Sequence, residues 1–98
     1  MNLKIVWTPQ AISGLNKVVT YLEENWTKKE IYNLENKINE LIERILKFPK
    51  ICPASSKHNN IRKGLVDKNN YLIYRINSTK RIIEIINFRG TRQRPLKG

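Results

Sequence analysis

The chain has 98 residues, the size of one domain, and we treat residues 1–98 as a single folding unit. Its 19 Lys and Arg residues outnumber 8 Asp and Glu residues, giving a formal net charge of +11, and its one cysteine excludes an internal disulfide. No apolar run is long enough to span a membrane and the N-terminus does not resemble a secretory signal, so we expect a cytoplasmic protein that does not bind membranes.

The chain begins with a predicted strand over residues 3–7, followed by a predicted helix. Thr8 is a suitable N-cap and Pro9 fits the first helical position. Apolar residues then recur at helical spacing and predict one buried stripe over about four turns, made of Ile12, Leu15, Val19 and Leu22.

The second predicted helix has the clearest pattern in the chain. Thr27 and Glu30 have the spacing of a capping box, and Pro49 ends the helix. Its apolar stripe consists of Ile31, Leu34, Ile38, Leu41, Ile45 and Phe48. Because few residues join the two helices, we expect an antiparallel helix hairpin whose stripes lie against one shared surface.

The second half of the chain is predicted to form strands. Residues 49–60 contain two prolines and read as a surface loop, and strands are expected at residues 61–67, 71–77 and 81–88. In the middle strand, Leu72, Tyr74 and Ile76 fall on one face. This order predicts an α+β fold, in which the helix hairpin covers a small antiparallel sheet and the N-terminal strand joins an edge.

The positive charge is concentrated in this strand-rich half. Residues 1–56 hold eight basic and six acidic residues, a net charge of +2, whereas residues 57–98 hold eleven basic and two acidic residues, a net charge of +9. The imbalance favours contact with an anionic partner, such as nucleic acid or an acidic protein segment. A solvated basic face that aids solubility is the alternative.

Most catalytic constellations are missing from the sequence. The single histidine, His58, lies on a loop six residues from the single cysteine, Cys52, without the framework of a nucleophilic pair. The four glycines are scattered and do not form a phosphate-binding loop, and no zinc-ligand spacing occurs. We therefore expect neither a metal nor a cofactor.

The remaining candidates for chemistry are cations and a tyrosine. Arginine can stabilise the extra charge of a phosphate during phosphodiester cleavage, and RNA cleavage by its own 2′-hydroxyl needs no metal. Alternation places Arg62 and Lys63 on opposite faces of their strand. Candidates for binding a partner or nucleic acid are Lys57, Lys63, Arg75, Arg81, Arg94 and Tyr71. Binding without catalysis is an equal alternative.

Several short motifs, in their order and spacing, resemble the RelE/ParE superfamily of bacterial toxins from type II toxin–antitoxin modules. They are I-V-W-T-P-Q-A, Y-L-E-E-N-W, the helix-ending F-P, I-R-K-G-L-V, Y-L-I-Y-R-I and I-I-E-I-I-N-F-R-G-T-R-Q-R-P, and they cover residues 3–95. The resemblance implies a helix hairpin on a small sheet. It also implies a toxin held inactive, in a toxin–antitoxin hetero-oligomer, by a cognate antitoxin with a largely disordered, acidic segment.

The superfamily divides by target. ParE-like members inhibit DNA gyrase, whereas RelE-like members cleave mRNA in the ribosomal A site. The R-Q-x-P ending and the lack of Tyr or His after residue 88 resemble the ParE-like branch, so we expect a ParE-like inhibitor of gyrase and replication. The second hypothesis is a metal-independent endoribonuclease that uses Arg62, Arg89 and Arg92 as catalytic cations, and the third is a non-toxic homologue.

Overall fold

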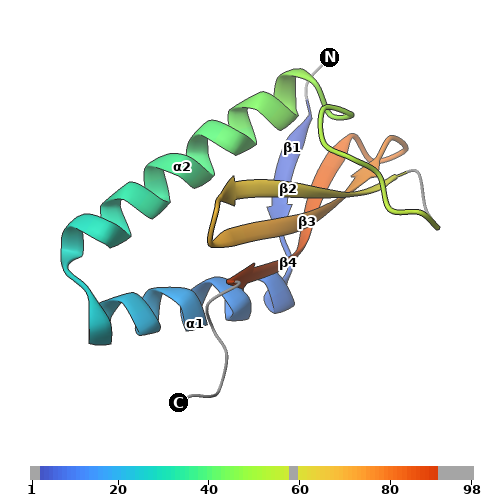
Figure 1. Ribbon diagram of the computed structural model, residues 1–98. Coiled ribbons are helices and arrows are strands. Elements are labelled where there is room, and N and C mark those ends of the chain that lie inside the picture. Colours follow the sequence, from blue (N-terminus) through green and yellow to red (C-terminus); the bar gives the residue numbers. More distant parts are fainter. Residues whose placement is uncertain (1–2, 58–59, 91–98) are drawn as a thin grey trace.

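The computed structural model describes residues 3–57 and 60–90 (Figure 1). It contains two helices and four strands, in the chain order β1 (Lys4–Trp7), α1 (Pro9–Asn25), α2 (Lys28–Lys47), β2 (Ile61–Asp67), β3 (Asn70–Asn77) and β4 (Ile82–Gly90). The α+β fold class predicted from the sequence is confirmed. No helix within the described ranges is long and apolar enough to cross a membrane.

The four strands form one sheet in the order β1-β4-β3-β2. Strands β2, β3 and β4 are antiparallel neighbours, as predicted, and β1 joins the sheet edge as expected. However, β1 runs parallel to β4, with Lys4 opposite Ile82 and Trp7 opposite Ile85, so the complete sheet is mixed. Strand β4, the last strand of the described residues, is therefore central, and β1 and β2 are the two edges.

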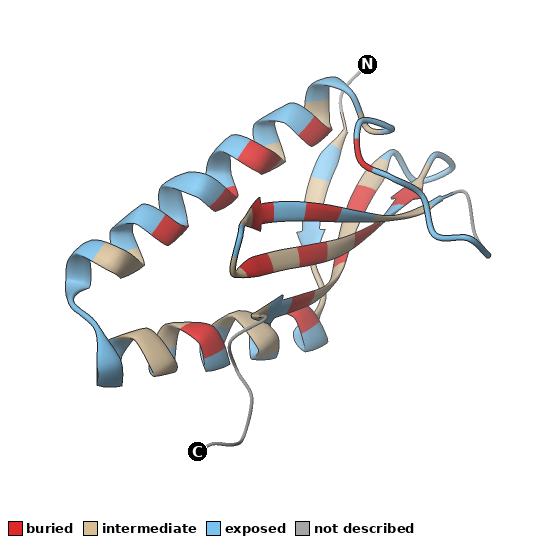
Figure 2. Cartoon of the chain, in the orientation of Figure 1, coloured by how far each residue is buried: buried red, intermediate tan, exposed pale blue. Residues whose placement is uncertain are grey.

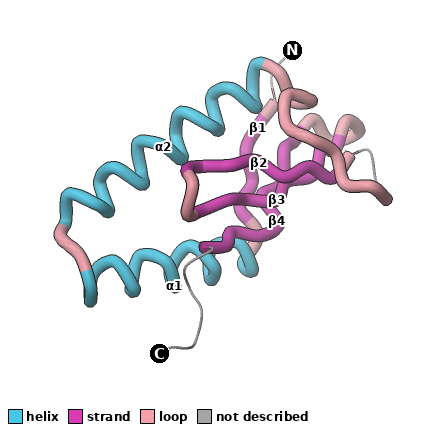
Figure 3. Tube along the Cα trace, in the orientation of Figure 1, coloured by secondary structure: helices cyan, strands magenta, loops and turns pink. Residues whose placement is uncertain are grey.

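Both helices lie on the same face of the sheet (Figure 3). They do not pack closely along their length, as a tight hairpin would, because α1 packs mainly on β4, whereas α2 divides its contacts among β2, α1 and β1. The helices consequently diverge from the turn at residues 26–27 (Figure 1).

Helix α1 begins where Thr8 caps it, as predicted. The Thr8 hydroxyl oxygen accepts a hydrogen bond from the Ala11 N–H at 3.2 Å. The buried residues of α1 are Ala11 and Val18, whereas Ile12 is 45 % exposed and Val19 only partly buried. The predicted stripe was therefore wrong at Ile12 and Val19. The face of α1 that packs on the sheet includes the small residue Ala11, which the pattern of large apolar residues did not identify.

Helix α2 agrees more closely with its predicted stripe. Leu34, Ile38, Leu41 and Ile45 are buried, and the Thr27 N–H donates to the Glu30 carboxylate at the start of the helix. The hydrogen bond from the Thr27 hydroxyl, together with this one from the Thr27 main chain, lowers the pKa of Glu30. Phe48 was expected to be buried but is 62 % exposed, because the helix has ended at Lys47 and the chain turns away.

The core lies between the helices and the covered face of the sheet (Figure 2). Its largest fully buried side chains are Tyr74, Phe88, Ile45, Leu72, Ile83 and Ile85. The alternation predicted for β3 is confirmed, since Leu72, Tyr74 and Ile76 are all buried. Burial raises the pKa of the Tyr74 phenol, whose O–H donates to the Pro49 carbonyl at 2.7 Å.

Candidate cationic face of the sheet

The second face of the sheet is not covered by either helix, and we call it the open face (Figure 3). Side chains of β2, β3 and β4 that alternate with the core residues lie there, and they include Ile61, Lys63, Leu65, Tyr71, Ile73, Arg75, Glu84, Asn87 and Arg89. Four of the residues singled out in the sequence as candidates thus share one surface.

Lys63, Tyr71 and Arg89 form a row across three neighbouring strands of the open face. The Lys63 ammonium nitrogen lies 4.3 Å from the centre of the Tyr71 ring, a cation–π contact. Tyr71 is the cross-strand partner of Arg89 in the β3–β4 ladder. Neither cation forms an ion pair with a described residue. The row therefore presents an aromatic ring between two charges that are free to bind an anion.

Arg75 lies on the same face, but it forms an ion pair with Glu84. Its Nη2 atom is 2.7 Å from Glu84 Oε1, and its Nε–H donates to the same oxygen. The Glu84 side chain is only 18 % exposed. The Glu84 carboxylate shares the open face with the row, but it is bound by the Arg75 guanidinium and is not free for proton transfer.

Arg62 lies on the other side of β2, as the alternation predicted. Its Nη1 atom donates to the carbonyl oxygens of Lys50 at 3.1 Å and Cys52 at 2.7 Å. Its Nε atom is buried and has no hydrogen-bond partner among the described residues. The guanidinium thus holds the loop that follows α2.

The structure separates Arg62 and Arg89, the two candidate catalytic cations that lie in its described part. Arg62 and Arg89 lie on opposite faces of the sheet, because the first points to the loop side of β2 and the second to the open face. Arg92 and Arg94 lie outside the described residues. A catalytic role shared by Arg62 and Arg89 would need an anion that reaches both faces.

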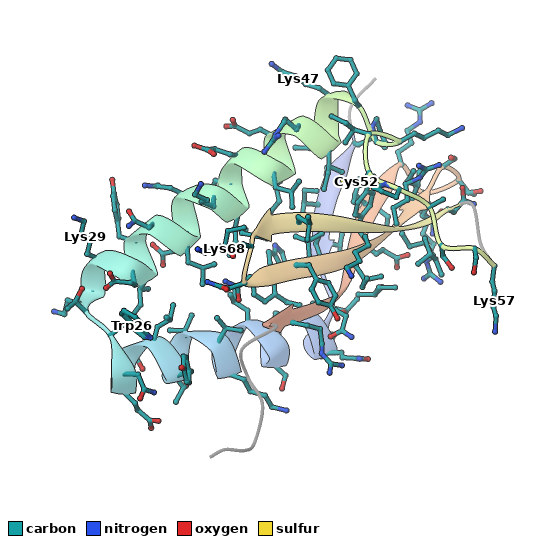
Figure 4. The ribbon with its side chains drawn as sticks, in the orientation of Figure 1. Trp26, Lys29, Lys47, Cys52, Lys57 and Lys68 are labelled. Atoms are coloured by element: carbon teal, nitrogen blue, oxygen red, sulfur yellow. The ribbon has the colours of Figure 1, made fainter. Side chains whose placement is uncertain are left out.

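The other two candidate cations lie away from the row. Lys57 is exposed in the loop between α2 and β2, where Figure 4 shows it at the far end of the molecule. Arg81 is exposed at the turn between β3 and β4 with a φ of 57°, which is uncommon for a residue other than glycine. Over the described ranges, no group of three or more His, Cys, Asp or Glu residues is placed to hold a metal ion.

A mixed sheet covered on one face by two helices and cationic on the other defines a small α+β protein with one open sheet face. The family model for the ParE toxin of the type II toxin–antitoxin system parDE matches residues 5–95. The chain therefore belongs to this family and is a toxin of a type II toxin–antitoxin system. No curated protein matches the sequence.

Solved structures with the same fold are similar to nearly the whole chain. The YoeB/ParE toxin from Agrobacterium tumefaciens has a TM-score of 0.64 and 17 % identity, covering 90 % of this chain and 98 % of its own. The YoeB dimer from Staphylococcus aureus has a TM-score of 0.61 and 19 % identity, covering 91 % and 97 %. YoeB in the heterotetrameric YoeB-YefM complex of that organism has a TM-score of 0.58, with the same identity and coverage.

The sequence did not single out every residue of the cationic face that matters for its chemistry. Glu84 was counted only as one of two acids in the strand-rich half, although it neutralises Arg75. Glu84 lies directly opposite Arg75 in the neighbouring strand, and this pairing would have identified it. The pairing can be found only when the register of the β3–β4 ladder is known. That register contains a bulge after Ile73, which the sequence pattern did not show.

Proposed function

We propose that this toxin inhibits DNA gyrase, and so replication, by binding through the open face rather than by cleaving a substrate. The observation that carries the proposal is the row of Lys63, Tyr71 and Arg89, two unpaired cations and a ring on a rigid sheet. The nearby carboxylate of Glu84 is held by Arg75. The row therefore offers binding groups, whereas acid–base groups are not assembled with it.

We also propose that a cognate antitoxin neutralises this toxin. The YoeB toxin of Staphylococcus aureus is seen in a complex with the antitoxin YefM. A net charge of +11 favours association with an acidic segment, which would be steered to the strand-rich half. The location is the cytoplasm, where both gyrase and the antitoxin occur.

A second candidate function is ribosome-dependent mRNA cleavage. The same row favours it, because an aromatic ring between two cations can stack on a base while the cations neutralise phosphates. In this mechanism Arg89 would stabilise the charge of the phosphate in the transition state. The reaction would be metal-independent.

The experiment is pulse labelling of DNA and protein synthesis after induction of the toxin without an antitoxin. We expect DNA synthesis to fall first while translation continues, and purified toxin to inhibit gyrase supercoiling. An earlier fall in protein synthesis would support the ribonuclease instead. Normal growth with folded toxin accumulating would contradict both candidate functions.

The role of the row is tested by the double variant Lys63→Ala, Arg89→Ala. We expect growth inhibition to be lost while the free energy of unfolding changes by less than about 1 kcal/mol, since exposed cations contribute little to stability. The matched control is Lys28→Ala, Lys37→Ala, which removes two exposed cations from α2. Equal toxicity of the row variant and the control would exclude the row as the target-binding surface.

A further inference from the structure

Strand β4 extends beyond the short strand β1, and its second half lies beside helix α1 instead. Strand β1 pairs with residues 82–85 of β4, and the Thr8 N–H then donates to the Ile85 carbonyl at 3.1 Å. The chain continues into α1, which passes along the remaining residues of β4 (Figure 1). This end of β4 therefore has a strand on one side, β3, and a helix on the other.

Helix α1 comes close to the main chain of β4 at Gly14. A Cβ atom at this position would lie only 2.1 Å from the Phe88 carbonyl oxygen, so the approach requires glycine. The approach brings polar residues of the two elements to one place. On α1 these are Gln10, Ser13 and Lys17, which follow one another at spacings of three and four and so share a face of the helix.

A cleft of about 470 Å³ lies at this junction of α1 and β4. Its polar side chains come from both elements and comprise two amides, a hydroxyl and two cations, namely Gln10, Ser13, Lys17, Asn87 and Arg89. Each of these side chains can donate a hydrogen bond. The cleft is therefore a concave site rich in donors, rather than an apolar surface that awaits cover.

The charge of the cleft is positive and is not balanced locally. Lys17 and Arg89 are exposed, and neither forms an ion pair with a described residue. No carboxylate is among the described residues that line the cleft. A ligand must supply negative charge and several acceptor oxygens, and a phosphate group supplies both.

The cleft adjoins the row on the open face, because Arg89 belongs to both. Unpaired cations thus follow one another from Lys63 on β2, through Arg89 on β4, to Lys17 on α1. Two strand spacings separate β2 from β4, a distance of about 10 Å. One phosphate group cannot contact all three cations, whereas successive phosphates of one strand can.

From these features we propose that the cleft between α1 and β4 binds a backbone phosphate of a nucleic-acid strand, which continues from there across the row. Lys17 and Arg89 neutralise the phosphate, and the hydroxyl of Ser13 and the amide of Asn87 donate to its oxygens. The inference rests on the proposed function only in taking the open face as the surface that contacts the target.

The test uses the purified toxin and a fluorescein-labelled oligothymidylate, with binding followed by fluorescence anisotropy. We expect saturable binding that is lost when the linkages are uncharged methylphosphonates. Thymidine monophosphate at the same phosphate concentration should displace the oligonucleotide only weakly. Equal displacement would overturn a strand as the ligand, and binding of the methylphosphonate form would overturn phosphate recognition. Neither gyrase nor growth inhibition enters the measurement, so the proposed function is tested separately.

A pair of lysine variants locates the phosphate. We expect Lys17→Ala to weaken binding of the oligonucleotide roughly tenfold, and to reduce the slope of log affinity against log salt by about 0.7, the value for one phosphate contact of a single strand. The matched control is Lys37→Ala, which removes an exposed cation of α2 outside the cleft and should change both quantities far less. Equal effects of the two variants would show that only the overall charge binds the strand, and would overturn the site.

Discussion

Arg62 and Lys63 are neighbours in the chain with the same charge, but their surroundings differ completely. Arg62 is committed to the carbonyl oxygens of the loop, whereas Lys63 lies over Tyr71 on the open face. The alternation of β2 allowed this separation to be predicted from the sequence. The loop carbonyls could not be predicted, because their position depends on how the chain leaves α2.

Tyr74 provides a pH-dependent test at the residue scale. Its folded-state pKa is raised above the usual value of 10.0 by burial, so the folded protein keeps a proton that the unfolded chain loses. The stabilising effect is fully present below about pH 10 and is lost as the pH rises further, with a slope of up to about 1.4 kcal/mol per pH unit.

We expect Tyr74→Phe to remove this alkaline slope and to cost about 1 kcal/mol at neutral pH, through loss of the hydrogen bond to the Pro49 carbonyl. Denaturant unfolding at several pH values measures both effects. The control is Tyr71→Phe, whose ring lies on the open face. An alkaline slope that is the same in Tyr74→Phe and the wild type would contradict the assignment.

At the scale of elements, the two helices show what apolar periodicity can and cannot predict. In α2, large apolar residues both form the stripe and fill the core, so the sequence identified the buried face correctly up to Ile45. In α1, the packed face includes Ala11 and Gly14, which carry little apolar surface and so do not contribute to the stripe. Close packing against β4 therefore determined the face, and periodicity alone could not reveal it.

Gly14 makes a specific prediction for this packing. A Cβ atom placed there would lie 2.1 Å from the Phe88 carbonyl oxygen, which is main chain and cannot easily move away. Alanine would favour the helix by about 1 kcal/mol through propensity alone. Because the clash forces α1 off β4, we expect Gly14→Ala to lower the free energy of unfolding by roughly 1–3 kcal/mol instead.

Urea unfolding of Gly14→Ala measures this change, with Ser13→Ala on the exposed side of the same helix as control. The control should gain slightly in stability or remain unchanged. A Gly14→Ala protein that is as stable as the control would mean that α1 does not approach β4 so closely.

At the scale of the whole molecule, charge is the property that the sequence predicted best. The net charges of +2 and +9 in the two parts of the chain place the excess in the loop, the sheet and the C-terminal residues. The division of that charge between two surfaces could not be predicted. It depends on strand register and on the loop, which direct Lys63 and Arg89 to the open face and Arg62 to the loop carbonyls on the other side of β2.

This charge predicts a strong dependence of association on salt. The association rate constant for a fluorescein-labelled polyglutamate peptide should fall roughly tenfold between low salt and high salt, while the dissociation rate constant changes much less, because screening weakens long-range attraction first. Stopped-flow fluorescence at several ionic strengths measures both constants. A salt effect confined to dissociation would show that the overall charge does not guide the encounter.

The position of β4 in the sheet has a consequence for synthesis of the toxin. Of the described strands β4 is made last, yet it lies between β1 and β3 and contacts α1. Until β4 has been made, β1 lacks its neighbour among the described strands and α1 lacks the surface on which it packs. Strand β1 and helix α1 therefore cannot reach their native packing until β4 joins them, so the first elements of the chain to be made are among the last to be fixed in the fold.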